Sequence, residues 1–384
     1  MNRKLKILYI HQYFKTPQEG GGIRSYHIAK AMVAAGHEVE MLTAHNQPEY
    51  VKKIMEGITV HYLPVAYDNS FSKIRRIMSF MSFFLKATKL SFKLKKDLIY
   101  ATSTPLSIGA IALCVKWITK TPYIFEVRDL WPKVPIELGF IRNRFVIGVL
   151  NSLEKLIYKN AKHIIALSPG IKQHISQFNT PIAIVPNFAD TAFFQTTETP
   201  VNDKLTISYI GTIGFANGVD TLIDLAIVAQ NSYPNQFQFN IMGDGAEKIK
   251  LQAKVTACGI CNVTFHDFSG KEKVRLLMQN ADVMYVSFAP FPILGETTSP
   301  NKFFDALAMK KVIVVNFEGW LKELLFTHHA GFFHDAKHHD KLLLHLLEAK
   351  KNAVLWENMS LSSENLAINN FELNHHLSKI IGLL

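Results

Sequence analysis

Short apolar runs alternate with helix-like segments along almost the whole chain, and the alternation starts afresh in the second half. The runs cover residues 7–10, 39–43, 58–63, 98–101, 123–127 and 163–167 in the first half, and residues 205–210, 237–242, 263–266, 282–287 and 312–316 in the second. Buried strands separated in this way by helices are typical of βαβ units, in which the strands are parallel. The pattern therefore predicts an α/β fold with one parallel sheet in each half.

The length of the chain leaves room for two separate cores, because 384 residues exceed what a single hydrophobic core usually serves. Residues 189–203, between the two halves, are rich in Thr, Pro and Asp and show no periodicity, as expected of a linker. We therefore predict a first domain over residues 1–188 and a second over residues 204–365. The last helical segment, residues 366–384, is expected to return to the first domain.

The stretch SPNKFFDALA, residues 299–308, is the most informative single element. It follows a loop, and Ser299 and Pro300 suit the N-cap and the first position of a helix. The opening turn of a helix has unpaired N–H groups and a partial positive charge, which attract phosphate, and Lys302 lies in that turn. Asp305 lies three residues further along the same helix face. A ligand with a diphosphate and a nearby diol, such as a nucleotide-sugar, would match these features, although an ordinary capped helix with an exposed Lys/Asp pair would share the spacing.

Glycine-bearing turns between strands and helices form a second candidate for phosphate binding. Three consecutive glycines precede the helix of residues 23–35, and two further turns follow the first two strands of the second half. Glycine lets backbone N–H groups approach a ligand closely, although a merely flexible turn would explain the same residues. The three consecutive glycines do not have the G-x-G-x-x-G spacing of a dinucleotide-binding motif. The glycines that we expect to face a phosphate are Gly21, Gly22, Gly211, Gly214, Gly243 and Gly245.

Asp129 lies directly after the apolar run of residues 123–127, at the carboxyl end of a predicted parallel strand. Ligands bind at this edge of an open α/β sheet. Asp129 could therefore orient an acceptor hydroxyl group, accept its proton or contact a donor sugar. A helix-capping role is the structural alternative.

The formal net charge of +11 is concentrated in residues 71–96, which contain eight Lys or Arg residues and no acid. Aromatic and aliphatic residues alternate with these cations, as they do in helices that lie on an anionic membrane surface. A core helix whose Lys side chains reach the solvent would also fit, whereas nucleic acid is not expected, because no recognised binding motif accompanies the charge. The residues that we expect to contact the membrane or a membrane-bound acceptor are Arg75, Arg76, Phe80, Phe83, Phe84, Lys86 and Lys89.

Other features point to a cytoplasmic protein without a metal site. The sequence has no run of 18 or more apolar residues, and its basic N-terminus passes directly into a strand-like run without a signal-peptide core. Cys258 and Cys261 have C-x-x-C spacing but no second pair, so we expect Gly259 to end a helix there rather than a metal or redox site. We therefore expect a protein that binds peripherally to the inner face of the plasma membrane.

Taken in order, these motifs are similar to those of the GT-B glycosyltransferases of family GT4, and most similar to the branch that builds O-antigen and capsule sugars, including fucosamine-transferase-like proteins. The resemblance extends over nearly the whole chain, and SPNKFFDALA is its most specific part. The segments that carry it are residues 10–14, 20–24, 126–132, 211–214, 243–245 and 299–308.

The resemblance implies two Rossmann-like domains that face each other across a cleft, with the donor nucleotide held mainly by the second. Asp305 would bind the ribose, and Lys302 with the turn of residues 211–214 would face the diphosphate. Gly21 and Gly22 would close over the diphosphate from the first domain. The other residues expected to bind the donor are Arg24, Thr298 and Asn301. Asp129 follows the position of the family's usual histidine, which is Arg128 here.

The chain departs from the family pattern at three places. The first glutamate of the E-x7-E pattern would fall at Thr297, and Glu296 stands one residue before it. The usual basic pair after the Gly211 turn is replaced by residues 215–217, Phe-Ala-Asn, so more of the diphosphate charge would fall on Lys302 and on helix dipoles. Lys310 and Val312 stand where relatives have Gly and Pro after the SPNKFFDALA helix, which would alter a helix cap rather than the chemistry.

The implied function is retaining, metal-independent transfer of a sugar from a nucleotide-sugar, with UDP as the expected nucleotide, to a polyprenyl-diphosphate-linked glycan. No cofactor is expected besides this co-substrate, and the expected catalytic residues are Asp129, Glu296 and Lys302. Two alternatives stay open: a nucleotide-sugar epimerase with the GT-B fold, and a membrane-associated binding protein that has lost activity.

Overall fold

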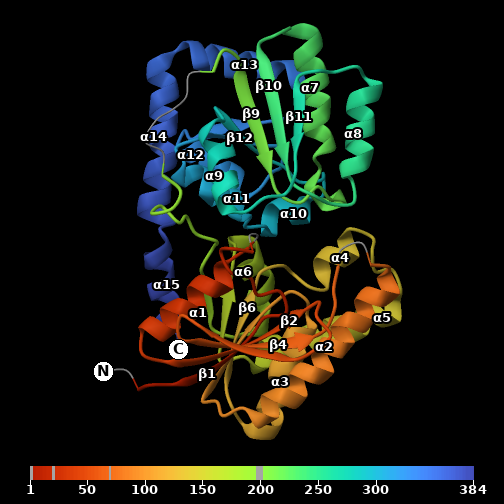
Figure 1. The fold of residues 1–384 in the computed structure, drawn as a ribbon, viewed down its shortest axis with the longest axis vertical. Coiled ribbons are helices and arrows are strands. Elements are labelled where there is room, and N and C mark those ends of the chain that lie inside the picture. The colour runs from red at the N-terminus through yellow and green to blue at the C-terminus, as the bar shows by residue number, and fades with distance from the viewer. Residues whose placement is uncertain (1–2, 20–21, 69–70, 196–201) are drawn as a thin grey trace.

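The computed structural model describes residues 3–19, 22–68, 71–195 and 202–384, which form two α/β domains stacked one above the other (Figure 1). The first domain has an eight-stranded sheet of order β3-β4-β2-β1-β5-β6-β7-β8, parallel except for the pair β3 and β4. Its strands are β1 (Lys6–Ile10), β2 (Glu38–His45), β3 (Val51–Met55), β4 (Ile58–Pro64), β5 (Leu98–Thr102), β6 (Tyr123–Val127), β7 (His163–Ala166) and β8 (Ile182–Ile184).

Helices cover both faces of this sheet. On one face α2, α3 and α5 lie side by side, and on the other α1 packs against the C-terminal helix α15 (Figure 1). Because both faces are covered, the central strands are buried throughout and read as continuous apolar runs, as β5 and β6 do. The helices of this domain are α1 (Arg24–Ala34), α2 (Lys73–Lys93), α3 (Ser107–Thr119), α4 (Lys133–Glu137), α5 (Arg144–Asn160) and α6 (Pro169–Ile175).

The second domain has a six-stranded, wholly parallel sheet of order β11-β10-β9-β12-β13-β14. Its strands are β9 (Leu205–Ile210), β10 (Phe237–Met242), β11 (Val263–His266), β12 (Val283–Val286), β13 (Val312–Val315) and β14 (Gly331–Phe333). Its helices are α7 (Asp220–Ser232), α8 (Lys248–Ala257), α9 (Lys271–Gln279), α10 (Pro292–Thr297), α11 (Asn301–Ala308), α12 (Trp320–Thr327), α13 (His339–Lys351) and α14 (Ala353–Asn370).

The chain passes between the domains twice, and the two crossings are hydrogen-bonded to each other. On the way back, α14 ends at Asn370 in the second domain, and α15 (Leu373–Ile381) lies on the first domain against α1 (Figure 1). Between them, the Ala189 N–H donates to the Phe371 carbonyl (2.8 Å), and the Leu373 N–H donates to the Ala189 carbonyl (3.1 Å). The two segments that cross between the domains are therefore joined to each other by backbone hydrogen bonds.

The two parallel sheets expected from the apolar runs are both present, and every predicted strand is found. Three strands were missed, β3, β8 and β14, and all three lie at a sheet edge. Edge strands are buried less than central ones, and β3 is largely exposed and lacks an apolar run. β8 and β14 are apolar but only three residues long, which is shorter than the runs that mark the central strands. The predicted C-terminal cap is also present: Gly259 has φ +62° just beyond α8, and Cys258 and Cys261 are both free thiols.

Candidate active site

The N-terminus of α11 lies at the junction of the two domains. The helix begins at Asn301 rather than at Pro300, which is extended (φ −75°, ψ 132°) and occupies the N-cap position. The prediction that Ser299 caps this helix is therefore wrong. Its hydroxyl oxygen instead accepts a hydrogen bond from the N–H of Asn187 in the first domain (3.0 Å), so it joins the domains rather than closing the helix end.

Lys302 is a buried cation without an acceptor. Its Nζ is shielded from solvent, makes no hydrogen bond, and lies 3.8 Å from the centroid of the Tyr209 ring at the end of β9. Burial lowers the pKa of this ammonium group to about 7. A buried ammonium group that is only in contact with an aromatic face is costly to keep charged, so this site is suited to a ligand that supplies negative charge.

The turn after β9 lies directly beside this ammonium group. Gly211 has φ +140°, and a Cβ atom built on it would lie 3.4 Å from Lys302 Nζ. Lys302 and this turn, both of which we expect to face the diphosphate, therefore lie side by side. The Tyr209 hydroxyl donates to the Thr212 carbonyl (2.7 Å), which holds the aromatic ring and the turn in fixed relation.

Asp305 lies on the same helix but has different neighbours. No ion pair in the described part of the chain joins it to Lys302; the charges near it are the ion pair of Lys271 and Asp190 (2.7 Å). Burial raises the pKa of the Asp305 carboxyl to about 8, an effect that Lys271 opposes and Asp190 reinforces. Lys302 and Asp305 thus place a desolvated amine and a desolvated carboxyl on the same helix, where the two domains meet.

Gly22 and Asn301 face each other across the junction. A Cβ atom on Gly22 would lie 3.4 Å from Asn301 Nδ2 and 3.5 Å from a terminal nitrogen of Arg128. The first domain therefore approaches the start of α11 at the glycine that we expected to close over the donor. Gly21 lies outside the described residues.

Gly243 and Gly245 have packing roles. A Cβ atom on Gly243 would lie 1.9 Å from the Gly211 carbonyl oxygen, and one on Gly245 would lie 2.3 Å from that of Ile213. Gly214 lies beside Asn217. Only glycine allows the turn after β10 to lie against the turn after β9, so direct contact with a donor is not needed to explain Gly243 and Gly245.

Arg24 does not face the candidate site, which corrects its assignment to the donor. It is buried and forms an ion pair with the buried Glu126 (3.0 Å), and it donates to the carbonyl oxygens of Val185 (3.0 Å) and Pro186 (2.6 Å). All three nitrogen atoms of the Arg24 guanidinium group therefore donate hydrogen bonds within the first domain. The sequence could not reveal this, because the partners of Arg24 are more than 100 residues away.

Asp129 is open to solvent on the first-domain side. Although part of the residue is exposed, the protein packed around its carboxyl partly desolvates that group and raises its pKa, and the neighbouring Arg128 opposes this shift. The backbone N–H of Arg128 donates to the Ser103 hydroxyl (2.9 Å), which fixes the start of the loop. His11 is buried just after β1 with an unpaired Nδ1; burial and Arg128 hold its pKa well below the ordinary value, so the ring is neutral.

α10 connects the candidate site to the first domain. The Ser168 hydroxyl at the start of α6 donates to the Thr297 carbonyl (2.9 Å), and Gly170 approaches the Glu296 carbonyl so closely that an added Cβ atom would lie 2.3 Å from it. The three residues around the end of α10 differ in exposure. The Glu296 side chain is exposed, whereas Thr297 is buried and its hydroxyl donates to the Ile293 carbonyl. The Thr298 hydroxyl is buried and unpaired. The catalytic role of Glu296 stays a prediction.

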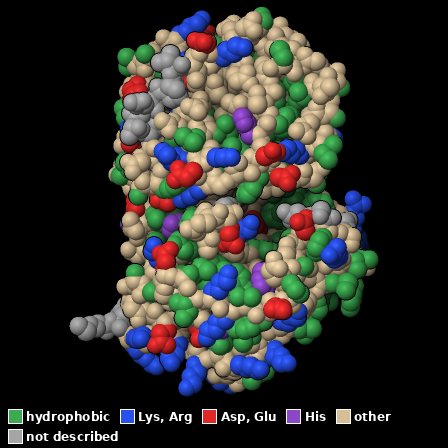
Figure 2. Space-filling view, viewed as in Figure 1, with side chains coloured by type: hydrophobic (Ala, Val, Ile, Leu, Met, Phe, Trp, Pro, Cys, Tyr) green, Lys and Arg blue, Asp and Glu red, His purple; other side chains and the backbone are tan. Residues whose placement is uncertain are grey.

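An aromatic contact stands where relatives have their basic pair. Phe215 packs against Phe140 of the first domain (6.1 Å between ring centroids) and against Phe291 (5.9 Å). Figure 2 shows that the surface is hollowed between the two domains. The contact between Phe140 and Phe215 joins the two domains.

The basic segment forms α2, but its outward face differs from the predicted one. Phe83 is buried in the core of the first domain, so it cannot be a membrane-facing aromatic residue as we expected. Phe80 is half-buried and is stacked on Tyr67. Phe84 and Arg76 are half-buried, while Arg75, Lys86 and Lys89 are exposed. The outward apolar residues, each more than half exposed, are Ile74, Ile77, Met78, Met81 and Leu85.

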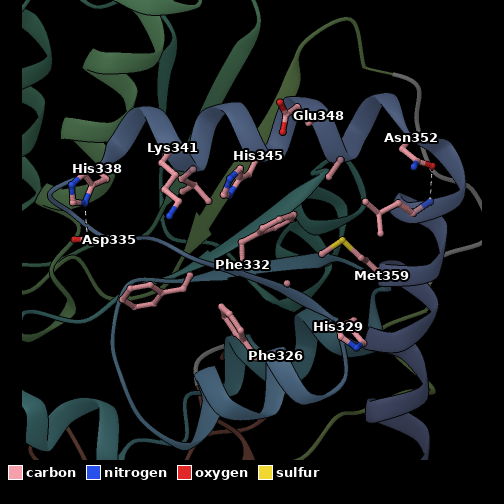
Figure 3. A pocket seen from close by; sticks show the side chains of 15 residues that line it. Phe326, His329, Phe332, Asp335, His338, Lys341, His345, Glu348, Asn352 and Met359 are labelled. Carbon is pink, nitrogen blue, oxygen red and sulfur yellow. Dashed lines mark hydrogen bonds and ion pairs between the residues drawn. The ribbon is translucent and has the colours of Figure 1, made fainter.

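A cavity of about 780 Å³ lies in the second domain between α12, β14, α13 and α14, away from the cleft (Figure 3). Lys341 and His345 point into it from α13, and Phe326 and Phe332 point into it from the opposite wall. The described part of the chain contains no group of three or more His, Cys, Asp or Glu residues that could hold a metal ion. Nor does any described helix combine the length and the hydropathy needed to span a bilayer.

Solved structures with the same two-domain architecture define the fold class as GT-B. Sucrose-phosphate synthase from Thermosynechococcus elongatus has a TM-score of 0.81 at 15% identity, covering 99% of this chain and 98% of its own. HepE of Anabaena, in complex with UDP-glucose, has a TM-score of 0.71 at 16% identity, covering 99% and 100%. WaaG, a glycosyltransferase involved in lipopolysaccharide biosynthesis, has a TM-score of 0.70 at 14% identity, covering 97% and 98%.

Two family models match the domains in turn: the glycosyl transferase 4-like domain over residues 19–187, and glycosyl transferases group 1 over residues 204–351. The chain therefore belongs to the GT-B glycosyltransferases of GT4/GT1 type. No curated protein sequence matches it. Family membership favours a transferase over the epimerase.

Proposed function

We propose that this protein is a retaining, metal-independent glycosyltransferase that transfers a sugar from a UDP-sugar to a polyprenyl-diphosphate-linked glycan in the synthesis of O-antigen or capsule. The nucleotide is inferred from the donor site and from relatives such as HepE, which binds UDP-glucose. The acceptor class is inferred from the basic, apolar face of α2 and from the motif resemblance. The likeness to WaaG, which acts in lipopolysaccharide biosynthesis, supports the same kind of pathway.

The observation that carries this proposal is the unpaired ammonium group of Lys302 beside the Gly211 turn and the N-terminus of α11. Sugar transfer leaves a nucleoside diphosphate on which negative charge grows in the transition state. Donors already fixed around that position stabilise the charge without reorganisation, and in a desolvated site they do so more strongly than in water. Lys302 would supply the positive charge, and the α11 terminus and the turn would supply backbone N–H groups.

The other roles follow from position. Asp305, whose carboxyl pKa is raised to about 8 by desolvation, would hydrogen-bond the ribose, and Gly22 and Asn301 would close the cleft over the diphosphate. Asp129 would orient the acceptor hydroxyl from the first domain, where it remains open to solvent. Glu296 would contact the donor sugar.

The membrane part of the proposal rests on α2. Its exposed side carries five aliphatic or methionine side chains among cations, and the described residues of the helix include no acid. Such a surface suits anionic lipid and would bring the cleft to a membrane-bound acceptor.

The proposal is tested first on the donor. Calorimetry with UDP and other nucleoside diphosphates should show binding to the wild-type protein that Lys302→Met weakens strongly. Lys310→Ala is a matched control, because Lys310 is a cation just beyond the same helix that pairs with Glu364 (2.8 Å). Equal affinity of the wild type and the Lys302 variant would remove the diphosphate site.

Turnover is then measured with UDP-sugars and a vesicle-bound polyprenyl-diphosphate glycan. We expect a lipid-linked product with the anomeric configuration of the donor, formed equally well after treatment with EDTA. Product formed from the donor alone would favour epimerisation, and transfer only to a soluble sugar phosphate would overturn the acceptor class.

A further inference from the structure

α5 has an outward face that the transferase chemistry does not use. It lies in the same layer as α2, because both helices pack against α3 (Figure 1). At 100° per residue, Phe145, Val149 and Leu156 fall within one narrow stripe of the helix. They are 80%, 52% and 43% exposed, and none of them is needed for the core of the domain.

Cations line one side of this stripe. By the same helical spacing, Arg144, Lys155 and Lys159 follow one another along it, and all three are exposed. The single acid of α5, Glu154, is buried and accepts a hydrogen bond from His174 (3.1 Å). The exposed face of α5 therefore combines an apolar stripe with positive charge and has no exposed acid.

The apolar stripe and the cations of α5 together distinguish between possible binding partners. A second copy of the chain, related by a two-fold axis through α5, would bring these cations together, which is unfavourable. Nucleic acid would use the cations but leave the apolar stripe without a partner. An anionic bilayer satisfies both, since the cations meet the headgroups while Phe145 and its neighbours enter the boundary with the acyl chains.

The start of α5 is also connected to the cleft. Phe140, which precedes the helix, packs against Phe215 of the second domain. The start of α5 therefore lies near a place where the two domains touch. We propose that α5 is a second lipid-binding element, which docks on the same anionic bilayer as α2 and orients the cleft toward it. This inference rests on the membrane contact proposed above for α2.

Vesicle flotation with the full chain tests the inference, with vesicles of phosphatidylcholine alone or with added phosphatidylglycerol. The variants are Phe145→Ser/Val149→Ser for the stripe, Arg144→Ser/Lys155→Ser/Lys159→Ser for the cations, and Ile77→Ser/Met81→Ser for α2. Because each basic residue near an anionic surface contributes about 1 kcal/mol, the triple variant should bind anionic vesicles roughly a hundredfold more weakly at low salt. The stripe variant should also bind more weakly, at every salt concentration.

Local contact is read out with Phe145→Trp, whose emission should shift to shorter wavelength on anionic vesicles. Since all the changed side chains are exposed, the variants should keep the melting temperature and UDP affinity of the wild type. Unchanged flotation of both α5 variants, with binding lost only in the α2 variant, would overturn the inference. So would α5-dependent dimerisation in sedimentation velocity, or α5-dependent binding to RNA in place of vesicles. Failure of UDP binding with intact flotation would instead count against the transferase proposal alone.

Discussion

Lys302 Nζ lies 3.8 Å from the centroid of the Tyr209 ring and has no hydrogen-bond acceptor. The contact joins the first turn of α11 to the end of β9, two elements separated by more than 90 residues in the sequence. Its energetic cost is visible in the lowered pKa of the ammonium group. An anion bound beside Lys302 would relieve that cost, so changes to Lys302 directly test the donor site.

Removal of the Lys302 charge should reduce catalysis more than stability. We expect Lys302→Met to lower kcat/KM about 10²–10³-fold, the usual loss when one fixed donor to a developing negative charge is removed. The melting temperature should rise or stay unchanged, because a buried unpaired cation is replaced by an apolar chain of similar length. Steady-state kinetics and thermal melting check both parts, with Lys310→Ala as the control. A large fall in melting temperature would instead identify Lys302 as a structural residue.

Donor binding should take up a proton near neutral pH. The Lys302 pKa is about 7 in the free protein, and a bound diphosphate must raise it, because an adjacent anion favours the charged form. Affinity for UDP should therefore fall as the pH rises above about 7, by up to tenfold per pH unit, until the raised pKa of the complex is reached. Calorimetry in buffers of different ionisation enthalpy measures the uptake, and Lys302→Met should abolish it. A pH-independent affinity in the wild type would contradict this assignment.

Asp305 should weaken the fold progressively as the pH rises. Its pKa is raised from 3.8 to about 8, so the folded protein holds a proton that the unfolded chain releases between these values. The stability that this group contributes is thus complete below pH 3.8 and is lost as the pH rises through 8. Asp305→Asn should therefore melt at the same temperature as the wild type near pH 4 and roughly 5 °C higher at pH 8. A difference that does not vary with pH would show that the carboxyl is not desolvated.

The contact between the two glycine turns should be intolerant of any side chain. Gly243→Ala would place a methyl group 1.9 Å from the Gly211 carbonyl oxygen, at φ +158°. We expect a loss of about 1–3 kcal/mol in the free energy of unfolding, together with weaker UDP binding as the Gly211 turn shifts. Gly270→Ala is the control, because nothing lies within 4 Å of the added atom there. Chemical denaturation of both variants distinguishes a steric effect from a general loss of backbone freedom.

The sequence predicted the central strands well because burial on both faces requires apolar residues at every position, as in β5. It predicted one site for Lys302 and the Gly211 turn because a helix start and a βα turn meet at the same edge of a parallel sheet. It assigned Arg24 and Phe83 wrongly for one shared reason: charge and aromaticity do not indicate which way a side chain points. Arg24 turns inward to Glu126, and Phe83 lies on the core side of an amphipathic helix.

The sequence by itself determined the two α/β domains, the family, and the identity of the residues at the start of α11, because these depend on local spacing and periodicity. Only the tertiary structure decided that Ser299 bonds Asn187 across the junction instead of capping its helix, and that Lys302 is left without an acceptor. It also brought Phe140 against Phe215 and gave α5 an outward apolar face. Partner choice and burial depend on contacts between segments far apart in the chain, and these contacts exist only once both domains have packed.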